Sequence, residues 1–163
     1  KDRLEVGVIY DPSRQELFSA IRGAGSQLDG RKIRVSKQNT LAGSLLGTGF
    51  PFRDKEDWME VYLDIFSDFT RKVGAIRRPG SAALDLAYVA SGRYDGFWEF
   101  GLQPWDVAAG ILIIQEAGGI VKNLIPEHDV LESGSILTGN PRVFELMHEI
   151  IKKYDSRLLK LYS

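Results

Sequence analysis

The sequence predicts an α/β fold, an α+β layered sandwich. Short segments with apolar residues at alternate positions, typical of strands, alternate with longer segments whose apolar residues recur every three or four positions, typical of helices. Strands and helices in alternation pack as layers around a shared core. The chain is 163 residues long and has no internal repeat or long linker, so we expect residues 1–163 to form a single domain.

Strands dominate the first third of the predicted fold. Apolar residues alternate in two segments that flank the turn residues Asp11–Arg14, and this pattern predicts a β-hairpin. Glycine-containing turns at 23–25 and 29–30 mark a further pair of short strands, and Pro51 ends another. The predicted strands are Leu4–Tyr10, Glu16–Arg22, the short pair ending near Val35, and Ser44–Phe50.

Helices alternate with strands in the rest of the chain. Lys55–Val73 has the apolar spacing of an amphipathic helix. Ser81 is a suitable N-cap for a second helix that ends near Gly92. A third helix is predicted to start at Asp106 and end at Gly118, and Asn140 followed by proline predicts the start of the last one. The strands between them are Ala75–Arg78, Asp95–Phe100, Ile120–Leu124 and Ser135–Leu137.

The composition excludes several classes of protein. Apolar residues make up 44% of the chain and charged residues 26%, which indicates a folded core rather than a disordered chain. The net charge of -1 argues against a strongly basic protein, so we expect neither direct nucleic-acid binding nor membrane binding. The absence of cysteine excludes disulfides and cysteine-ligated zinc, and is compatible with the cytoplasmic location that we expect.

The strongest candidate site is the segment from Glu99 to Gly110. It presents Glu99 at a strand end and Asp106 at a helix start, joined by a glycine- and proline-containing elbow in which Trp105 is expected to wedge against the core. Backbone N–H groups at the helix start favour an ionised Asp106, and Mg²⁺ prefers such hard oxygen ligands. The alternative is that Asp106 only caps the helix and that Glu99 is a solvated charge.

A second candidate is the segment Arg77–Ala83. Gly80 followed by the small residues Ser81 and Ala82 lets a ligand approach the backbone N–H groups at a helix start. The arginines at 77 and 78 can attract phosphate. The alternative is an ordinary strand-to-helix turn whose arginines form surface ion pairs.

Other residues that often carry chemistry are weaker candidates. His128 and His148 lack the spacing of zinc ligands. Gly47–Gly49 is too short for a nucleotide-binding loop, and the motifs G-x-x-x-x-G-K-[ST] and G-x-S-x-G do not occur.

One long segment resembles a known family. Trp105–Gly119 is similar to the carboxyl-terminal signature of the inositol monophosphatase family, W-D-x-A-[AG]-G…E-A-G-G. Arg77–Leu84 and Gly92–Glu99 fit the same family in order and spacing, as does Thr138–Asn140. The resemblance extends over essentially the whole chain and is strongest to bacterial inositol-1-monophosphatases of the extragenic-suppressor type.

The resemblance implies a Mg²⁺-dependent phosphomonoester hydrolase, acting on inositol 1-phosphate or a related sugar phosphate, with the α-β-α-β-α sandwich of the family. Asp106 matches an aspartate that binds metal and meets an inositol hydroxyl. Glu99 matches a glutamate that hydrogen-bonds the inositol ring, and Gly80, Ser81 and Ala82 match the lining of the substrate pocket. A homodimer is also implied.

The sequence departs from the family in its metal ligands. The family's other ligands lie in a glutamate-bearing segment and a D-P-[LI]-D-G-[ST] motif, and neither occurs here; Asp11-Pro12 is followed by Ser-Arg. We therefore expect the chain to be the carboxyl-terminal portion of such a protein, without the upstream metal-binding portion. A single carboxylate should hold Mg²⁺ poorly, so the chain alone is expected to be inactive.

Two alternatives remain. A fructose-bisphosphatase or a 3′-phosphatase of adenosine nucleotides is possible within the same enzyme class, although Glu99 and Gly80–Ala82 favour inositol phosphates. From a different class, the chain can be a non-catalytic interaction module linked to transcription and ribosomal RNA processing, with a transcription factor as partner. Arg77 and Arg78 fit that suppressor-type subgroup, in which this region lies near the dimer interface.

Overall fold

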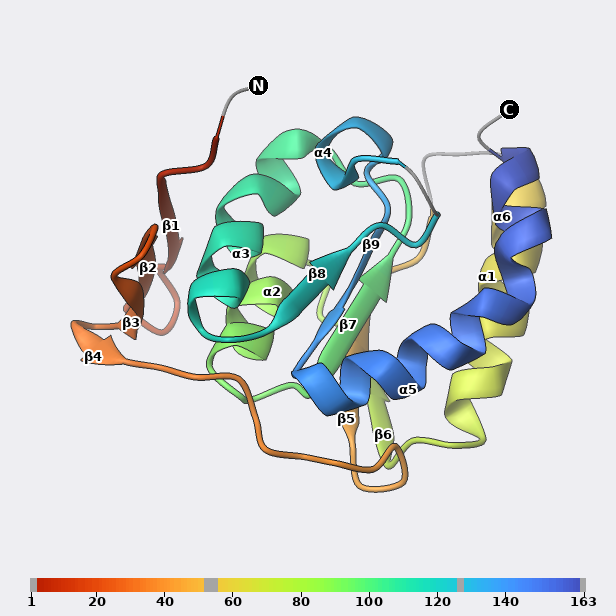
Figure 1. Cartoon of the computed structure of the whole chain (residues 1–163), viewed down its shortest axis with the longest axis horizontal. Helices are drawn as coiled ribbons and strands as arrows, with labels where there is room; N and C mark the ends of the chain where they lie inside the picture. The colour runs from red at the N-terminus through yellow and green to blue at the C-terminus, as the bar shows by residue number, and fades with distance from the viewer. Residues whose placement is uncertain (1–2, 52–55, 126–127, 162–163) are drawn as a thin grey trace.

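The computed structural model describes residues 3–51, 56–125 and 128–161, and its layers confirm the predicted sandwich (Figure 1). A small sheet, the helix pair α2 and α3, a second sheet, and a group of helices formed by α1, α5 and α6 follow one another across the molecule. The helices are α1 Glu56–Thr70, α2 Ala82–Ala90, α3 Pro104–Glu116, α4 Val130–Ser133, α5 Pro141–Ile151 and α6 Asp155–Leu161, with a 3₁₀ turn at Lys152–Tyr154.

The small sheet is the antiparallel meander that the hairpin pattern predicts. Its strands are β1 Val6–Asp11, β2 Glu16–Ile21, β3 Gly25–Leu28 and β4 Arg31–Lys32, paired in that order. The Asp11 carboxylate accepts a hydrogen bond from the Ser13 N–H at 2.9 Å and closes the first turn. Phe18 and Ala20 are buried beneath α3, whereas Val6, Val8 and Tyr10 on the other face of the sheet are exposed.

The second sheet carries the features that position the candidate site. Its strands are β5 Leu45–Thr48, β6 Ala75–Arg77, β7 Gly96–Glu99, β8 Ile120–Lys122 and β9 Ile136–Gly139, in the order β6-β5-β7-β9-β8. Strands β6, β5 and β7 are parallel, so their carboxyl ends lie at one edge of the sheet. Ligand sites of open α/β sheets are found outside this edge.

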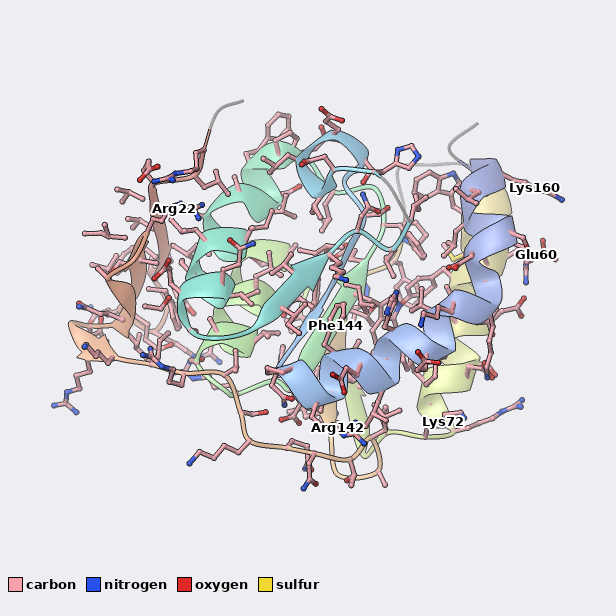
Figure 2. The ribbon with its side chains drawn as sticks, in the orientation of Figure 1. Arg22, Glu60, Lys72, Arg142, Phe144 and Lys160 are labelled. Carbon is pink, nitrogen blue, oxygen red and sulfur yellow. The ribbon has the colours of Figure 1, made fainter. Side chains whose placement is uncertain are left out.

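Both faces of the second sheet are covered by apolar helix faces. On one side α2 and α3 pack so closely that a side chain at Gly110 would lie 2.6 Å from Leu86. On the other side Tyr62 and Phe69 of α1 are fully buried against Trp98 of β7, which confirms the predicted amphipathic helix. Figure 2 shows Phe144 directed into this core, while Glu60, Lys72 and Lys160 point outward.

The structure corrects two predictions near the elbow. Helix α3 begins at Pro104, two residues before the expected start at Asp106, because proline suits the first helical position. Trp105 does not wedge against the core but is 76% exposed. It precedes the buried Val107 by two residues, or about 200° around the helix, and therefore lies on the opposite, exposed side of α3.

Further differences are smaller. Most strands are shorter than predicted, but β9 extends two residues beyond the predicted end at Leu137. The helices α4 and α6 were not anticipated from the sequence pattern. Within the described ranges, the helices are too short or too polar to cross a lipid bilayer.

Candidate functional site

The predicted site residues meet in one hollow of about 310 Å³ at the carboxyl ends of β5 and β7. The starts of α2 and α3 complete its wall. Segments far apart in the sequence therefore converge on the same space. The hollow is lined by Gly49–Pro51, Arg78, Gly80–Ala83, Glu99–Leu102 and Asp106.

Glu99 is the last residue of β7 and its side chain is half-buried. Burial, together with the negative charges of Asp85 and Asp106, raises the pKa of its carboxyl to about 8, and the charge of Arg78 opposes this rise. A carboxyl that stays protonated near neutral pH both donates and accepts hydrogen bonds. Glu99 can therefore pair with a hydroxyl group, which also does both.

Asp106 is the third residue of α3, and its Oδ2 accepts a hydrogen bond from the Gln103 N–H at 2.9 Å. The capping role that was the alternative interpretation is therefore real. Oδ1 makes no hydrogen bond to the described residues. Asp106 thus combines a structural bond at the helix start with a second oxygen at the hollow.

The segment Gly80–Ala82 forms the predicted strand-to-helix turn. Gly80 has a φ of 99°, a left-handed conformation that favours glycine. Ser81 is the N-cap, as predicted, and its Oγ accepts the Leu84 N–H at 3.5 Å. The N–H groups of Ala82 and Ala83, in the first turn of α2, have no partner within the helix, so this wall of the hollow suits an anion or a hydroxyl group.

The two arginines before α2 have different environments. The Arg78 guanidinium lies 4.8 Å from the centroid of the Phe50 ring, in a cation–π contact at the hollow. The Arg77 guanidinium donates a hydrogen bond to the Ile76 carbonyl at 3.1 Å and is not part of the lining. Arg78 is therefore the arginine placed to attract a phosphate.

Two residues of this region were missed in the sequence. Asp85 lies on α2 with 1% of its surface exposed, and its Oδ1 has no hydrogen-bond partner among the described residues. Burial raises the pKa of this carboxyl to about 7. The sequence feature that could have identified it is an aspartate between two leucines, Leu84 and Leu86, in a predicted helix. Gly49 was dismissed with its loop, yet a Cβ atom there would lie 2.0 Å from Oε1 of Glu99.

The described residues do not form a magnesium site by themselves. No group of three or more histidine, aspartate or glutamate side chains in this part of the chain is arranged to hold a metal ion. Asp106 offers one carboxylate, as the sequence implies. Mg²⁺ needs about six oxygen ligands, so a site at Asp106 requires ligands from elsewhere.

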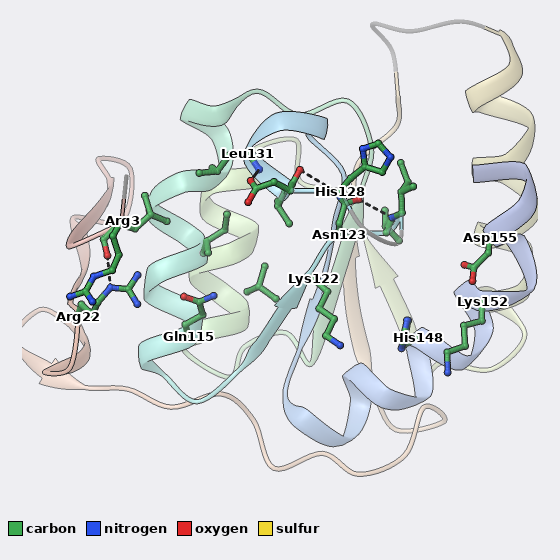
Figure 3. Close-up of a pocket in the computed structure, with 17 residues that line it drawn as sticks. Arg3, Arg22, Gln115, Lys122, Asn123, His128, Leu131, His148, Lys152 and Asp155 are labelled. Atoms are coloured by element: carbon green, nitrogen blue, oxygen red, sulfur yellow. Dashed lines mark hydrogen bonds between the residues drawn. The ribbon is translucent and has the colours of Figure 1, made fainter. Parts of the chain in front are cut away.

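A larger hollow of about 720 Å³ lies along β8 and contains none of the predicted site residues (Figure 3). Arg3 and Arg22 lie at one end of it, and His148 and Lys152 lie at the other. Burial and the charges of Lys152 and Lys122 lower the pKa of His148. His128 also lines this hollow, but no metal-binding group is found here within the described residues. Its polar side chains are spread over several elements and do not converge as those of the smaller hollow do.

Comparison with known proteins identifies relatives that are similar to this chain over most of its length. A sequence model described as the inositol monophosphatase family matches residues 1–156. A protein named Nus factor SuhB from Pseudomonas aeruginosa is 52% identical over 161 residues, which cover 98% of this chain and 59% of that protein.

Solved structures agree with the sequence match. The extragenic suppressor protein suhB from Bartonella henselae is 42% identical, with a TM-score of 0.86 over 91% of this chain and 57% of that one. The inositol monophosphatase from Anabaena is 40% identical, with a TM-score of 0.83 over 91% of this chain and 61% of that one. The chain therefore spans about three fifths of the length of these relatives.

Proposed function

The chain belongs to the inositol monophosphatase family, and from this premise we propose that it carries the substrate-recognition part of a Mg²⁺-dependent phosphomonoester hydrolase. The substrate that the site suits best is inositol 1-phosphate or a closely related sugar phosphate. One observation supports this most strongly: Gly80–Ala82, Glu99 and Asp106, from three separate segments, line a single small hollow.

The groups around the hollow suit the two ends of such a substrate. Polyol hydroxyls both donate and accept hydrogen bonds, which matches the Glu99 carboxyl and the Oδ1 of Asp106. The N–H groups that begin α2 and the Arg78 guanidinium can bind phosphate oxygens. A volume of about 310 Å³ is at the lower end of the range for small-molecule sites and favours a compact substrate.

Asp106 would contribute one ligand to Mg²⁺, and the remaining ligands would come from residues outside this chain. When bound, the metal ion would polarise the phosphoryl group. The residues of this chain bind and orient the sugar. We propose that the chain has no phosphatase activity without an upstream metal-binding portion.

Replacing Asp106 is the primary test. In a protein of the relatives' full length that carries this sequence, we expect Asp106→Asn to lower Mg²⁺-dependent release of phosphate from inositol 1-phosphate by about 100-fold or more. The amide preserves the side-chain shape, but it removes the charge. Steady-state phosphate release measures the change.

The matched control is Asp155→Asn, because Asp155 lines the larger hollow. We expect this variant to retain turnover. Near-normal turnover of Asp106→Asn would contradict the proposed site. Loss of activity in Asp155→Asn alone would place the site in the larger hollow instead.

The same protein distinguishes related substrates. We expect inositol 1-phosphate to be hydrolysed with a higher kcat/KM than fructose 1,6-bisphosphate or an adenosine 3′-phosphate. A preference for either of these two would reassign the substrate within the enzyme class.

A second function, binding of a transcription partner, is favoured by the relatives named Nus factor at about half identity. We propose that the full-length protein forms a homodimer and binds a transcription factor through a surface separate from the hollow. Retention of a transcription-elongation factor by the wild type and by Asp106→Asn, with reduced retention by Arg77→Ala, would support this second function. Absence of specific retention by the wild type would refute it.

A further inference from the structure

Gly49 lies directly beside the Glu99 carboxyl. Strands β5 and β7 are parallel, with Thr48 next to Trp98 in register. The residues that follow in this register are Gly49 and Glu99, so they are neighbours across the two strands. Nothing in the proposed function yet assigns a role to Gly49.

The Glu99 carboxyl occupies the space that a side chain at Gly49 would need. A Cβ atom built on Gly49 would lie 2.0 Å from Oε1, 2.2 Å from Cδ and 2.5 Å from Oε2 of Glu99. All three distances are far shorter than van der Waals contact. Any residue other than glycine at this position would therefore displace the whole carboxyl group.

The backbone does not explain this glycine. Gly80 and Gly101 near the hollow have positive φ angles, but the φ of Gly49 lies outside the left-handed region. An alanine would be compatible with the backbone there. The atoms in the way belong to the end of a flexible side chain, so the fold can accept alanine if Glu99 rotates.

We propose that Gly49 is a positioning residue for substrate specificity: because it has no side chain, the Glu99 carboxyl can lie next to the end of β5, and the hollow of about 310 Å³ stays open for a polyol ring. Both residues line that hollow. A side chain at position 49 would push the carboxyl into the space of the ring and away from the hydroxyl it binds. This inference rests on the proposed function, and it deepens the assignment of Glu99.

The test is Gly49→Ala in a protein of the relatives' full length that carries this sequence. We expect KM for inositol 1-phosphate to rise about tenfold or more, with kcat changed less than about threefold, because ring binding is weakened and the phosphoryl group is untouched. With 4-nitrophenyl phosphate, which has no ring hydroxyls, both constants should remain near the wild-type values.

Two controls separate this role from a structural one. Gly43→Ala makes the same substitution, and its Cβ would meet the end of the Gln38 side chain at 2.6 Å, away from the hollow. We expect it to leave KM unchanged. In a Glu99→Ala background, Gly49→Ala should have no further effect on KM, because the displaced group is already absent.

The outcomes are distinct. If the wild type does not hydrolyse inositol 1-phosphate, the proposed function fails. If the wild type is active but Gly49→Ala leaves KM unchanged, this inference fails alone. If Gly49→Ala lowers kcat equally for both substrates, or acts independently of Glu99, the residue is structural and the proposal is wrong.

Discussion

The acidic groups at the two ends of strand β7 differ in their environments. Asp95, immediately before the strand, has both carboxylate oxygens bonded: Oδ1 accepts the Ser36 hydroxyl at 2.5 Å, and Oδ2 accepts the Leu45 N–H at 2.7 Å. At the other end, burial raises the pKa of Glu99 to about 8. The buried Asp85 nearby lacks a partner for its Oδ1 among the described residues.

The difference separates groups that stabilise the fold from groups that are available for chemistry. Around Asp95 the bonds form a closed network, since Asn140 donates to Ser36 at 2.8 Å and its Oδ1 accepts two N–H groups of α5. Around Glu99 the negative charges of Asp85 and Asp106 raise the pKa of the carboxyl, and Glu99 and Asp106 line a hollow. Perturbed groups in a cleft are typical of functional sites, whereas satisfied networks are typical of structural positions. Both ends belong to motifs that resemble the family.

Replacing Asp95 should produce the largest loss of stability. Asp95→Ala removes two hydrogen bonds and leaves the Leu45 N–H without its acceptor. We expect the free energy of unfolding to fall by roughly 2–4 kcal/mol, measured by urea denaturation. Glu145→Ala, which removes an exposed pair with Arg142, is the control and should change it by less than about 0.5 kcal/mol. If Asp95→Ala and Glu145→Ala lower the free energy of unfolding equally, the Asp95 end of β7 does not have the stabilising role described above.

Asp85 should make the free energy of unfolding depend on pH. Burial raises its pKa to about 7 in the folded protein, whereas the value in an unfolded chain is near 3.8. The folded state therefore holds a proton that the unfolded state loses. Stability from this group is fully present below about pH 4 and is lost as the pH rises towards and through 7.

The variant that isolates this effect is Asp85→Asn. We expect it to flatten the fall in unfolding free energy between pH 5 and pH 7 by about 1 kcal/mol per pH unit. Urea denaturation at several pH values measures the slope. A wild-type slope that persists in the variant would show that Asp85 is ionised in the folded protein and that a different group causes the pH dependence.

The sequence predicted most of the helices and strands, and it grouped residues that the structure brings together. Ser81 as N-cap, the α1 helix and the hairpin follow from local pattern, and the residues Gly80–Ala82, Glu99 and Asp106 do come together in one hollow. The pattern did not indicate that the face of the small sheet with Val6, Val8 and Tyr10 would be exposed, because alternation shows which residues share a face and not what covers that face.

The missed residues have a physical explanation. Gly49 was missed because its neighbour Glu99 lies fifty residues away in the chain, and only the register of β5 with β7 brings the two together. Trp105 was expected to wedge the elbow against the core, but its place in the first turn of α3 decides its exposure. Asp85 is an ionisable residue at a buried helix position. The sequence pattern alone does not show what role such a residue has.

The most direct test measures turnover per folded molecule for Asp106→Asn and Asp95→Ala together, in a protein of the relatives' full length that carries this sequence. Phosphate release from inositol 1-phosphate is divided by the folded fraction obtained from urea denaturation. We expect Asp106→Asn to lose about 100-fold or more in turnover with little loss of stability, whereas Asp95→Ala should lose stability and keep turnover. Retained turnover in Asp106→Asn, or an equal loss per folded molecule in Asp95→Ala, would contradict this expectation.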